Sequence, residues 1–483
     1  MLFNGLQDYL SALDRRGELL TITDPIDPEL EVTEIADRFV RAGGPALRLT
    51  NPKGSRYPVV INLFGTLERT CFALGVSDLN EIGARLEELL HAEPPSSLID
   101  RIRAVPKLLE ISNWMPRTVG KASCQEVIED QPRLSDLPAL KCWPQDGGRF
   151  ITLPLVFTRH PDTGRRNVGM YRMQIYDDCT TGMHWHPHKV GAEHYRRYRA
   201  LGRRMPVAVA LGSDPAVIYS ATAPLPEDFD EMLFAGFLRR RPVELVKCRT
   251  SDLEVPADAE FILEGYVEPG ELRMEGPFGD HTGYYSLSDE FPVFHLTMLT
   301  RRSQPVYPAT IVGPPPKEDC FLAKATERIF LPLLRMQLPE VIDINLPVEG
   351  IFHNLAFVRI AKRYPGHALK VMHALWGLGQ MAFTKIIIVV DEEVNVQNLS
   401  EVIWRVGNNI DPERDICFVR GPVDILDHAS QLPGFGSKMG VDATRKWPGE
   451  GFGRPWPDVI EMGPETKARV DALFANLGLE KMK

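Results

Sequence analysis

Two carboxylates lie five residues apart in the segment 274–285, which reads Met-Glu-Gly-Pro-Phe-Gly-Asp-His-Thr-Gly-Tyr-Tyr. The glycines allow backbone angles that other residues resist, and the proline fixes its own φ angle. A turn of this kind can direct Glu275 and Asp280 toward one point. Neighbouring carboxylates near an arginine have their pKa values driven apart, which is how proteins prepare an acid and a base. The alternative is a surface turn with solvated acids.

A second polar segment, 167–172, reads Asn-Val-Gly-Met-Tyr-Arg. On a regular strand Asn167 and Arg172 would face opposite sides, unless a bulge at Gly169 intervenes. Arg172 could pair with Glu275, or it could hold a carboxylate or phosphate through two hydrogen bonds. A surface arginine on a barrel strand is the alternative.

A third segment is the run His-Trp-His-Pro-His-Lys that begins at His184. If this run were extended, His184, His186 and His188 would share one face, which is typical of a zinc or iron site. The proline favours an irregular strand, so one or two of these histidines could instead be polar lining. Glu231 begins an expected helix and by its own pattern is an ordinary helix glutamate.

Composition restricts the class of protein. The chain has 483 residues and a net charge of −10, which argues against nucleic acid or an anionic membrane surface as the main partner. Its seven cysteines are scattered and form no Cys-x-x-Cys pair, as expected of reduced thiols in a cytoplasmic protein. Neither a signal peptide nor an apolar run long enough to span a bilayer is recognisable.

The pattern of apolar residues predicts four segments. Residues 1–115 alternate strands with helices, which indicates a small α/β unit. Residues 116–315 contain short strands separated by turns, which favours an antiparallel barrel or sandwich. Residues 316–455 return to a βαβ pattern with a parallel sheet, and residues 456–483 form a helical tail.

Taken together, the motifs resemble those of the UbiD family of reversible, non-oxidative decarboxylases that use prenylated FMN. The likeness covers nearly the whole chain in order and is closest to the branch that acts on prenylated 4-hydroxybenzoate. The segments that carry it are 42–47, 167–172, the histidine run ending at His188, 223–226 with Glu231, 247–256, 275–285 and 436–447.

The resemblance implies an α/β protein (α+β overall) in which the central segment is a split β-barrel that binds flavin and the C-terminal α/β domain builds oligomers. It implies a catalytic network of Asp280, Glu275 and Arg172. It implies divalent-metal ligands Asn167, His188 and Glu231. It also implies cofactor-binding residues Met170, Tyr171, Arg172, His184, Trp185, His186, Lys189 and Val190.

The implied cofactors are prenylated FMN and Mn²⁺ or Mg²⁺, with K⁺ as an optional second ion. The implied partners are an aromatic, 4-hydroxybenzoate-like or an unsaturated carboxylic acid, a flavin prenyltransferase that supplies the cofactor, and further copies of the chain in a dimer or hexamer. Peripheral membrane contact is expected if the substrate carries a polyprenyl tail, and no nucleic acid is expected. The sequence departs from some relatives at His184, His186 and Pro187, which bears on the substrate.

Two other functions compete with the decarboxylase. One is a metal-dependent hydrolase built on His184, His186 and His188, and the other is a non-catalytic assembly subunit with the same fold. The presence of Arg172, Glu275 and Asp280 favours the enzyme. In that enzyme we expect one acid to stay ionised while the other carries a proton, and the family position assigns proton delivery to Asp280.

Overall fold

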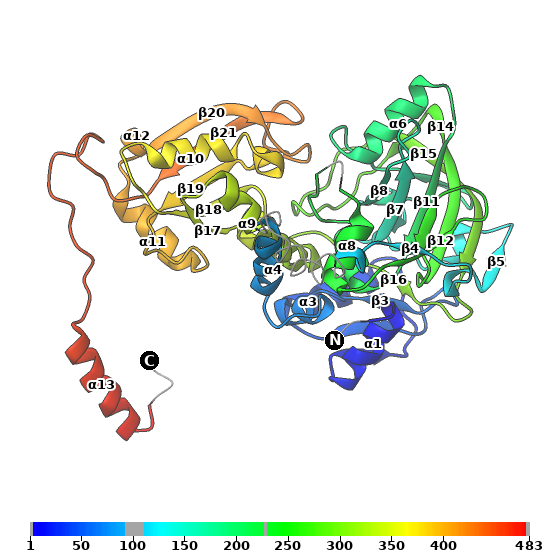
Figure 1. Ribbon diagram of the computed structural model, residues 1–483. Coiled ribbons are helices and arrows are strands. Elements are labelled where there is room, and N and C mark those ends of the chain that lie inside the picture. Colours follow the sequence, from blue (N-terminus) through cyan, green and yellow to red (C-terminus); the bar gives the residue numbers. More distant parts are fainter. Residues whose placement is uncertain (1–2, 92–110, 227–228, 480–483) are drawn as a thin grey trace, which may run out of the picture.

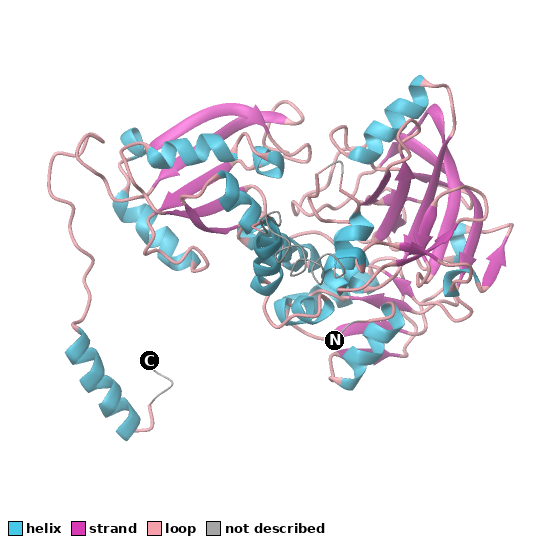
Figure 2. Cartoon of the chain, viewed as in Figure 1, coloured by secondary structure: helices cyan, strands magenta, loops and turns pink. Residues whose placement is uncertain are grey.

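The computed structural model describes residues 3–91, 111–226 and 229–479. Figure 1 shows the N-terminal and central segments packed together, with the C-terminal α/β unit joined to them through helix α9 (Glu318–Gln337). Figure 2 shows helices and strands in both parts, as a mixed α/β fold requires. Within the described residues, no helix is both long and apolar enough to cross a bilayer.

The N-terminal unit is a four-stranded sheet with helices against it. Its strands lie in the order β1-β2-β3-β16, so the fourth strand comes from far along the chain and pairs with β3 in parallel. The apolar residues of α1, including Leu6, Leu10 and Leu13, are buried at helical spacing. The elements are α1 (Leu6–Arg15), β1 (Leu19–Ile22), α2 (Glu31–Arg41), β2 (Ala46–Leu49), β3 (Val59–Ile61), α3 (Leu67–Ala73), α4 (Asn80–Leu90) and β16 (Tyr307–Pro308).

The central unit is a seven-stranded, largely antiparallel sheet in the order β10-β15-β14-β11-β7-β8, with β5 paired to β15. Among the described residues no pairing joins β8 to β10, so the sheet is open rather than a closed ring. Its strands are β5 (Val127–Glu129), β7 (Pro154–Arg159), β8 (Arg166–Met170), β10 (Thr180–Gly182), β11 (Met205–Leu211), β14 (Phe261–Glu275) and β15 (Asp289–Arg301).

Smaller elements surround this sheet. Two short sheets, β13-β12-β4 and β6-β9, lie beside it, and α6 and α8 pack on β8. These elements are β4 (Arg117–Thr118), η1 (Ser123–Gln125), η2 (Leu134–Asp136), β6 (Phe150–Ile151), β9 (Met173–Gln174), α6 (Val190–Ala200), α7 (Pro215–Ser220), α8 (Glu231–Arg239), β12 (Glu244–Lys247) and β13 (Glu254–Pro256).

Strands β14 and β15 carry the acidic turn. They are the longest strands of the sheet, and Glu275 pairs with Asp289 at their shared end, so the turn is the connection between them. Because strand residues alternate faces, Met274 is 54% exposed whereas Glu275 is 1% exposed. The strand therefore directs the Glu275 carboxylate into the protein.

The C-terminal unit is a five-stranded mixed sheet in the order β17-β18-β19-β21-β20. The predicted parallel pairing is present between β18 and β19 and between β19 and β21, and the two edge pairs are antiparallel. Its elements are β17 (Val341–Asn345), η3 (Val348–Gly350), β18 (Leu355–Ile360), α10 (His367–Leu375), η4 (Gly379–Phe383), β19 (Ile386–Val390), α11 (Leu399–Asn409), α12 (Pro412–Asp415), β20 (Ile416–Pro422) and β21 (Phe435–Asp442).

The expected C-terminal helix is α13 (Pro464–Asn476), at the end of an extended arm that runs away from the body in Figure 1. None of its residues is buried. Several apolar side chains of the arm are largely exposed, among them Ile460 at 99%.

The mixed α/β class is confirmed. Two local expectations were wrong. The segment 167–172 is not one regular strand, because β8 ends at Met170 and β9 begins at Met173, and the histidine run forms no strand. The proposed limits of the four segments stay predictions.

Candidate active site

Arg172 lies between the two acids of the turn. Its Nε donates a hydrogen bond to Glu275 Oε1 at 3.0 Å, and Nη1 donates to Asp280 Oδ2. The third donor, Nη2, reaches Ser286 Oγ at 3.2 Å, and the guanidinium carbon lies 4.5 Å from the centroid of the Phe278 ring. The side chains of Arg172, Glu275 and Asp280 are 9%, 0% and 10% exposed, so this ion-pair network is shielded from solvent.

The break between β8 and β9 explains how Arg172 reaches this position. The strand ends at Met170, and the Tyr171 ring folds back over Gly169, where an added Cβ would lie 2.3 Å from the tyrosine oxygen. Arg172 therefore lies outside the strand, and the rule that strand residues alternate between two faces does not fix its direction. Its side chain turns toward Glu275.

The turn is held by hydrogen bonds to its backbone. The Gly276 N–H donates to Gln174 Oε1 at 2.7 Å, and the Gly279 N–H donates to Asp146 Oδ1 at 2.8 Å. Gly276 has a φ of 95°, which L side chains resist, and an added Cβ on Gly279 would lie 2.1 Å from the Trp143 ring. Glycine is thus required at both ends of the turn that sets the separation of the two acids.

The neighbours of both acids lower their pKa values. Burial by itself would raise the pKa of Asp280, but Arg172 and His281 outweigh burial and hold that pKa well below its usual range. For Glu275, burial is likewise outweighed by His184 and Arg172, so its pKa is lowered. Donors reach both oxygens of Asp280 but only Oε1 of Glu275, whose Oε2 is buried without a partner among the described residues. The expectation that one of the two acids carries a proton at rest therefore stays a prediction.

The histidine run turns back on itself. His184 Nδ1 lies 2.9 Å from Glu275 Oε1, and His184 Nε2 lies 2.7 Å from His186 Nε2. Burial, with the neighbouring positive groups, lowers the pKa of His186 to about 2 and keeps it neutral. His188 instead packs on the C-terminal unit, with its ring centroid 5.0 Å from that of Phe383.

This arrangement does not support the hydrolase hypothesis. His184 and His186 are hydrogen-bonded to each other, His184 is also hydrogen-bonded to Glu275, and His188 packs against Phe383 of the C-terminal unit. Among the described residues, the His, Cys, Asp and Glu side chains with metal-ligand spacing are His281, His353 and Asp424, not the histidine run.

Two of the three predicted metal ligands lie side by side. Asn167 is on β8, Glu231 is the first residue of α8, and the N–H of Val168 donates to Glu231 Oε2 at 3.1 Å. Burial raises the pKa of Glu231 to about 7, which nearby N–H groups offset only in part. A divalent cation beside Glu231 would stabilise its charged form and offset the effect of burial. Amide and carboxylate oxygens are ligands that suit Mn²⁺ or Mg²⁺. No hydrogen bond among the described residues joins His188 to either of them.

The predicted cofactor residues are buried or half-buried and lie between the end of β8 and the start of α6. Trp185 Nε1 is buried with no hydrogen-bond partner among the described residues, and no side chain caps the N-terminus of α6 at Lys189. Burial lowers the pKa of Lys189, and Asp424 offsets this only in part. A phosphate group would accept hydrogen bonds from the free N–H groups at this helix end and would balance the charge of Lys189. Val190 begins the helix, and Tyr171 belongs to the same buried apolar cluster as Trp185 and Ala192. Met170 packs against a different apolar cluster.

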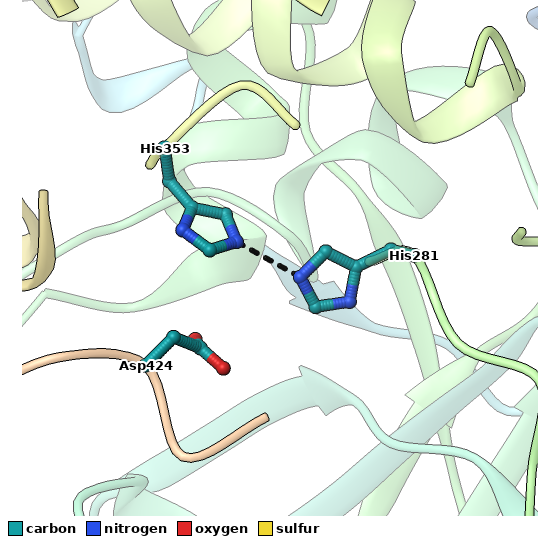
Figure 3. A group of neighbouring side chains, drawn as sticks. All are labelled: His281, His353 and Asp424. Atoms are coloured by element: carbon teal, nitrogen blue, oxygen red, sulfur yellow. Dashed lines mark hydrogen bonds between the residues drawn. The ribbon is translucent and has the colours of Figure 1, made fainter. Parts of the chain in front are cut away.

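The C-terminal unit covers this site through contacts that sequence reasoning did not find. His281 Nε2 lies 2.9 Å from His353 Nε2, and the Tyr284 ring centroid lies 4.0 Å from that of His428. Figure 3 shows the Asp424 carboxylate facing the two imidazoles, with ligand atoms of all three residues within 4.8 Å of one another. His281 stands in the acidic turn, but His353 and Asp424 carry no local sequence signal.

Comparisons with known proteins identify the family. Three sequence models of 3-octaprenyl-4-hydroxybenzoate carboxy-lyase match in order: its N-terminal domain over residues 10–86, its Rift-related domain over 117–315 and its C-terminal domain over 320–443. HmfF from Pelotomaculum thermopropionicum, a UbiD-class enzyme solved with FMN, is 30% identical over 94% of this chain and 97% of its own, with a TM-score of 0.78. The chain belongs to the UbiD family.

Two further relatives of this UbiD-family chain extend the comparison. A protein of Archaeoglobus fulgidus without an assigned function is 52% identical over 98% of both chains. The closed-form structure of vanillic acid decarboxylase from Sedimentibacter hydroxybenzoicus is 27% identical to this chain. The alignment covers 99% of both chains and has a TM-score of 0.86. Its open form gives 0.81, so the present arrangement of domains is nearer to the closed form of that enzyme.

Proposed function

We propose that this UbiD-family protein catalyses the reversible, non-oxidative decarboxylation of an aromatic or unsaturated carboxylic acid with prenylated FMN and a divalent metal. The observation that carries the proposal is the buried network of Arg172 with Glu275 and Asp280. An enzyme that removes a carboxylate needs a cation to hold that group and a positioned acid to supply the replacing proton. A 4-hydroxybenzoate-like acid, with or without a polyprenyl tail, is the proposed substrate class.

Each residue of the network has a separate role in the proposed reaction. Prenylated FMN, when bound, supplies the electron sink for the charge that carbon dioxide leaves behind. Arg172 holds the substrate carboxylate with donors that now contact the two acids. Asp280 faces the substrate and delivers the proton, while Glu275, anchored by His184, keeps Arg172 in place. The covering C-terminal unit excludes water from these charges, which strengthens each interaction.

The segment between β8 and α6 would hold the cofactor. Lys189 and the first N–H groups of α6 suit its phosphate, and Trp185 offers a buried donor that has no partner in the described part of the chain. Asn167 and Glu231 would hold Mn²⁺ or Mg²⁺ next to that phosphate, with His188 as the third ligand and K⁺ as an optional second ion. Filling these positions would satisfy the buried groups that the protein alone leaves uncompensated.

The first test extracts the cofactor and measures carbon dioxide release. The chain is produced together with a flavin prenyltransferase, the proposed cofactor supplier, and its flavin is identified by mass spectrometry. A panel of hydroxylated, methoxylated and prenylated benzoic acids and unsaturated acids is then supplied. We expect prenylated FMN and release of carbon dioxide from at least one acid. Flavin-loaded protein that releases none from any acid would overturn the proposed activity.

Replacing Glu231 by glutamine should remove metal and flavin together. The substitution keeps the size of the side chain but loses the charge that balances the cation, so metal content should fall at least roughly tenfold. The matched control is Asp230→Asn, since asparagine also caps a helix and Asp230 is the cap of α8. Metal analysis and flavin absorbance are the measurements. Full metal occupancy in the Glu231 variant would contradict this ligand assignment.

We also propose a cytoplasmic homo-oligomer, a dimer or hexamer, in which the arm bearing α13 contacts another copy. The exposed Ile460, Met462, Leu473 and Leu477 support this, because such apolar groups are usually covered. All seven cysteines are free thiols, as a reducing compartment requires. Peripheral contact with a membrane belongs to the proposal only for a polyprenylated substrate, and nucleic acid is not a proposed partner.

Truncation after Pro457 should convert the oligomer into a smaller species. The cut removes the exposed apolar arm and leaves the described core untouched, so thermal stability of each subunit should change little. Light scattering at micromolar concentration measures the mass, and Glu465→Gln on the same helix serves as the control. A full-length chain that is already monomeric would contradict the oligomer.

A further inference from the structure

Asp280 accepts hydrogen bonds at both carboxylate oxygens. Oδ2 receives the Arg172 guanidinium, while Oδ1 receives the backbone N–H of His281 at 2.7 Å and its Nδ1 at 2.8 Å. Every contact comes from a donor, so the group is held as a carboxylate. An acid held in this way must receive a proton before it can deliver one, and the nearest group that can provide it is the His281 imidazole.

His281 is placed to carry that proton. Its Nδ1 faces a carboxylate oxygen and therefore bears hydrogen, and its Nε2 lies 2.9 Å from His353 Nε2 (Figure 3). Three carboxylates act on the ring from different elements: Asp280 from the turn, Asp319 from α9 and Asp424 from the C-terminal unit. Burial opposes charge on the imidazole, but these carboxylates outweigh burial and raise the pKa of His281.

His353 is the neutral partner of this pair. Burial and the positive charge of His281 lower the pKa of His353 to about 4, while Asp424 and Asp427 act in the opposite direction. A neutral His353 accepts the Nε2–H of a charged His281, with its own Nδ1 buried and without a partner among the described residues. In this hydrogen bond His281 Nε2 carries the hydrogen and only His353 Nε2 offers a lone pair, so the two Nε2 atoms cannot both ligate a metal ion while His281 is charged.

We propose that His281 stores the proton that Asp280 delivers, and that His353 is a positioning residue that holds His281 charged and oriented. The inference rests on the proposed decarboxylation. The bond between the substrate carbon and its carboxyl carbon breaks, and its electron pair stays behind when carbon dioxide leaves. His281 Nδ1 passes its proton to Asp280 Oδ1, Asp280 passes a proton to that carbon, and bulk water returns one proton to His281.

The position of His353 couples this store to domain closure. His281 belongs to the central unit, whereas His353 and Asp424 belong to the C-terminal unit. The imidazole therefore gains its acceptor and one of its carboxylates only when the two units are packed as they are here. The His281 imidazole therefore carries its proton while the C-terminal unit covers the site and excludes water. After it has passed that proton to Asp280, it takes up another one when solvent reaches the site.

The first test needs neither cofactor nor substrate. Histidine signals of the cofactor-free chain are followed by NMR across pH, and His281 is assigned through its loss in His281→Gln. We expect His281 to titrate above the ordinary histidine range, and Asp280→Asn to move that titration down by at least one pH unit. Exposed His373 is the internal control. A neutral His281 at pH 7, or zinc bound tightly by the two histidines in its place, would overturn the proposal.

The second test uses the cofactor-loaded enzyme. His281 stays charged below its raised pKa, so turnover should be level at low pH and fall as pH rises through that value. His281→Gln should lower kcat roughly 10-fold to 100-fold with little change in KM, less than direct loss of the acid would cost. Added imidazole should restore part of the rate.

His353→Gln separates a positioning role from a structural one. It should shift the alkaline limb of the pH profile to lower pH, because His281 loses an acceptor, whereas His373→Gln should leave the profile unchanged. A loss of rate that is equal at every pH and insensitive to imidazole would overturn the positioning role. Parent enzyme that decarboxylates no acid would instead overturn the proposed function, and the NMR result would still decide the charge of His281.

Discussion

Asp280→Asn should reduce turnover by roughly 10²–10⁴, the usual range for a positioned acid or base. Asparagine keeps the size of the side chain, and its carbonyl oxygen can still accept the two hydrogen bonds from His281. It cannot receive a proton from His281 and deliver it to carbon. Cofactor binding should be intact, because the predicted phosphate and metal positions lie on other elements. Steady-state carbon dioxide release and flavin absorbance measure the two effects.

The same substitution should slow hydrogen–deuterium exchange into the product, since that exchange is the reverse of the proton-delivery step. Asp289→Asn is the matched control, because Asp289 pairs with Glu275 across β14 and β15 but is exposed. Asp280→Glu should retain part of the activity, since it keeps a carboxyl group near His281. Near-normal exchange in fully loaded Asp280→Asn would move proton delivery to Glu275 or to water.

Arg172→Gln should lower both activity and stability. Its removal leaves Glu275 and Asp280 as buried carboxylates without a cation, and breaking a buried ion pair from one side costs about 3–5 kcal/mol. The substrate also loses the donors that would hold its carboxylate, so kcat/KM should fall by at least roughly 10²-fold. Thermal unfolding and steady-state kinetics measure the two effects.

The loss of stability should depend on pH in a defined direction. In the parent the pKa values of both acids are lowered from 3.8 and 4.5, so their contribution is present above those values and lost as pH falls through the folded pKa. Without Arg172 the acids take up protons at higher pH. The difference in the free energy of unfolding should therefore be largest near neutral pH and shrink in acid.

Arg172→Lys is the control for charge alone. A lysine can neutralise part of the carboxylate pair, but it offers a point charge in place of the three donors that now reach Glu275, Asp280 and Ser286. Stability should be partly restored, and activity should stay low. Full activity in this variant would mean that the geometry of the guanidinium is not needed.

Several features were predictable from the chain itself. The apolar periodicity of Leu6, Leu10 and Leu13 places α1, and the run at 386–390 places β19, because burial of one face imposes a short-range pattern. The glycines and proline after Glu275 predict a tight turn for the same local reason. Motif spacing along the chain identified the family, and the domain matches confirm it.

Only the tertiary structure decided the charge of the site. Local pattern placed two acids in one turn, and from it we expected one of them to be protonated. The structure adds His184 beside Glu275 and His281 beside Asp280, and together with Arg172 they outweigh the effect of burial on the pKa of each acid. Coulomb energies depend on distance and burial, which sequence separation does not encode. His353 joins His281 from 72 residues away, through packing of two domains that neither local sequence specifies.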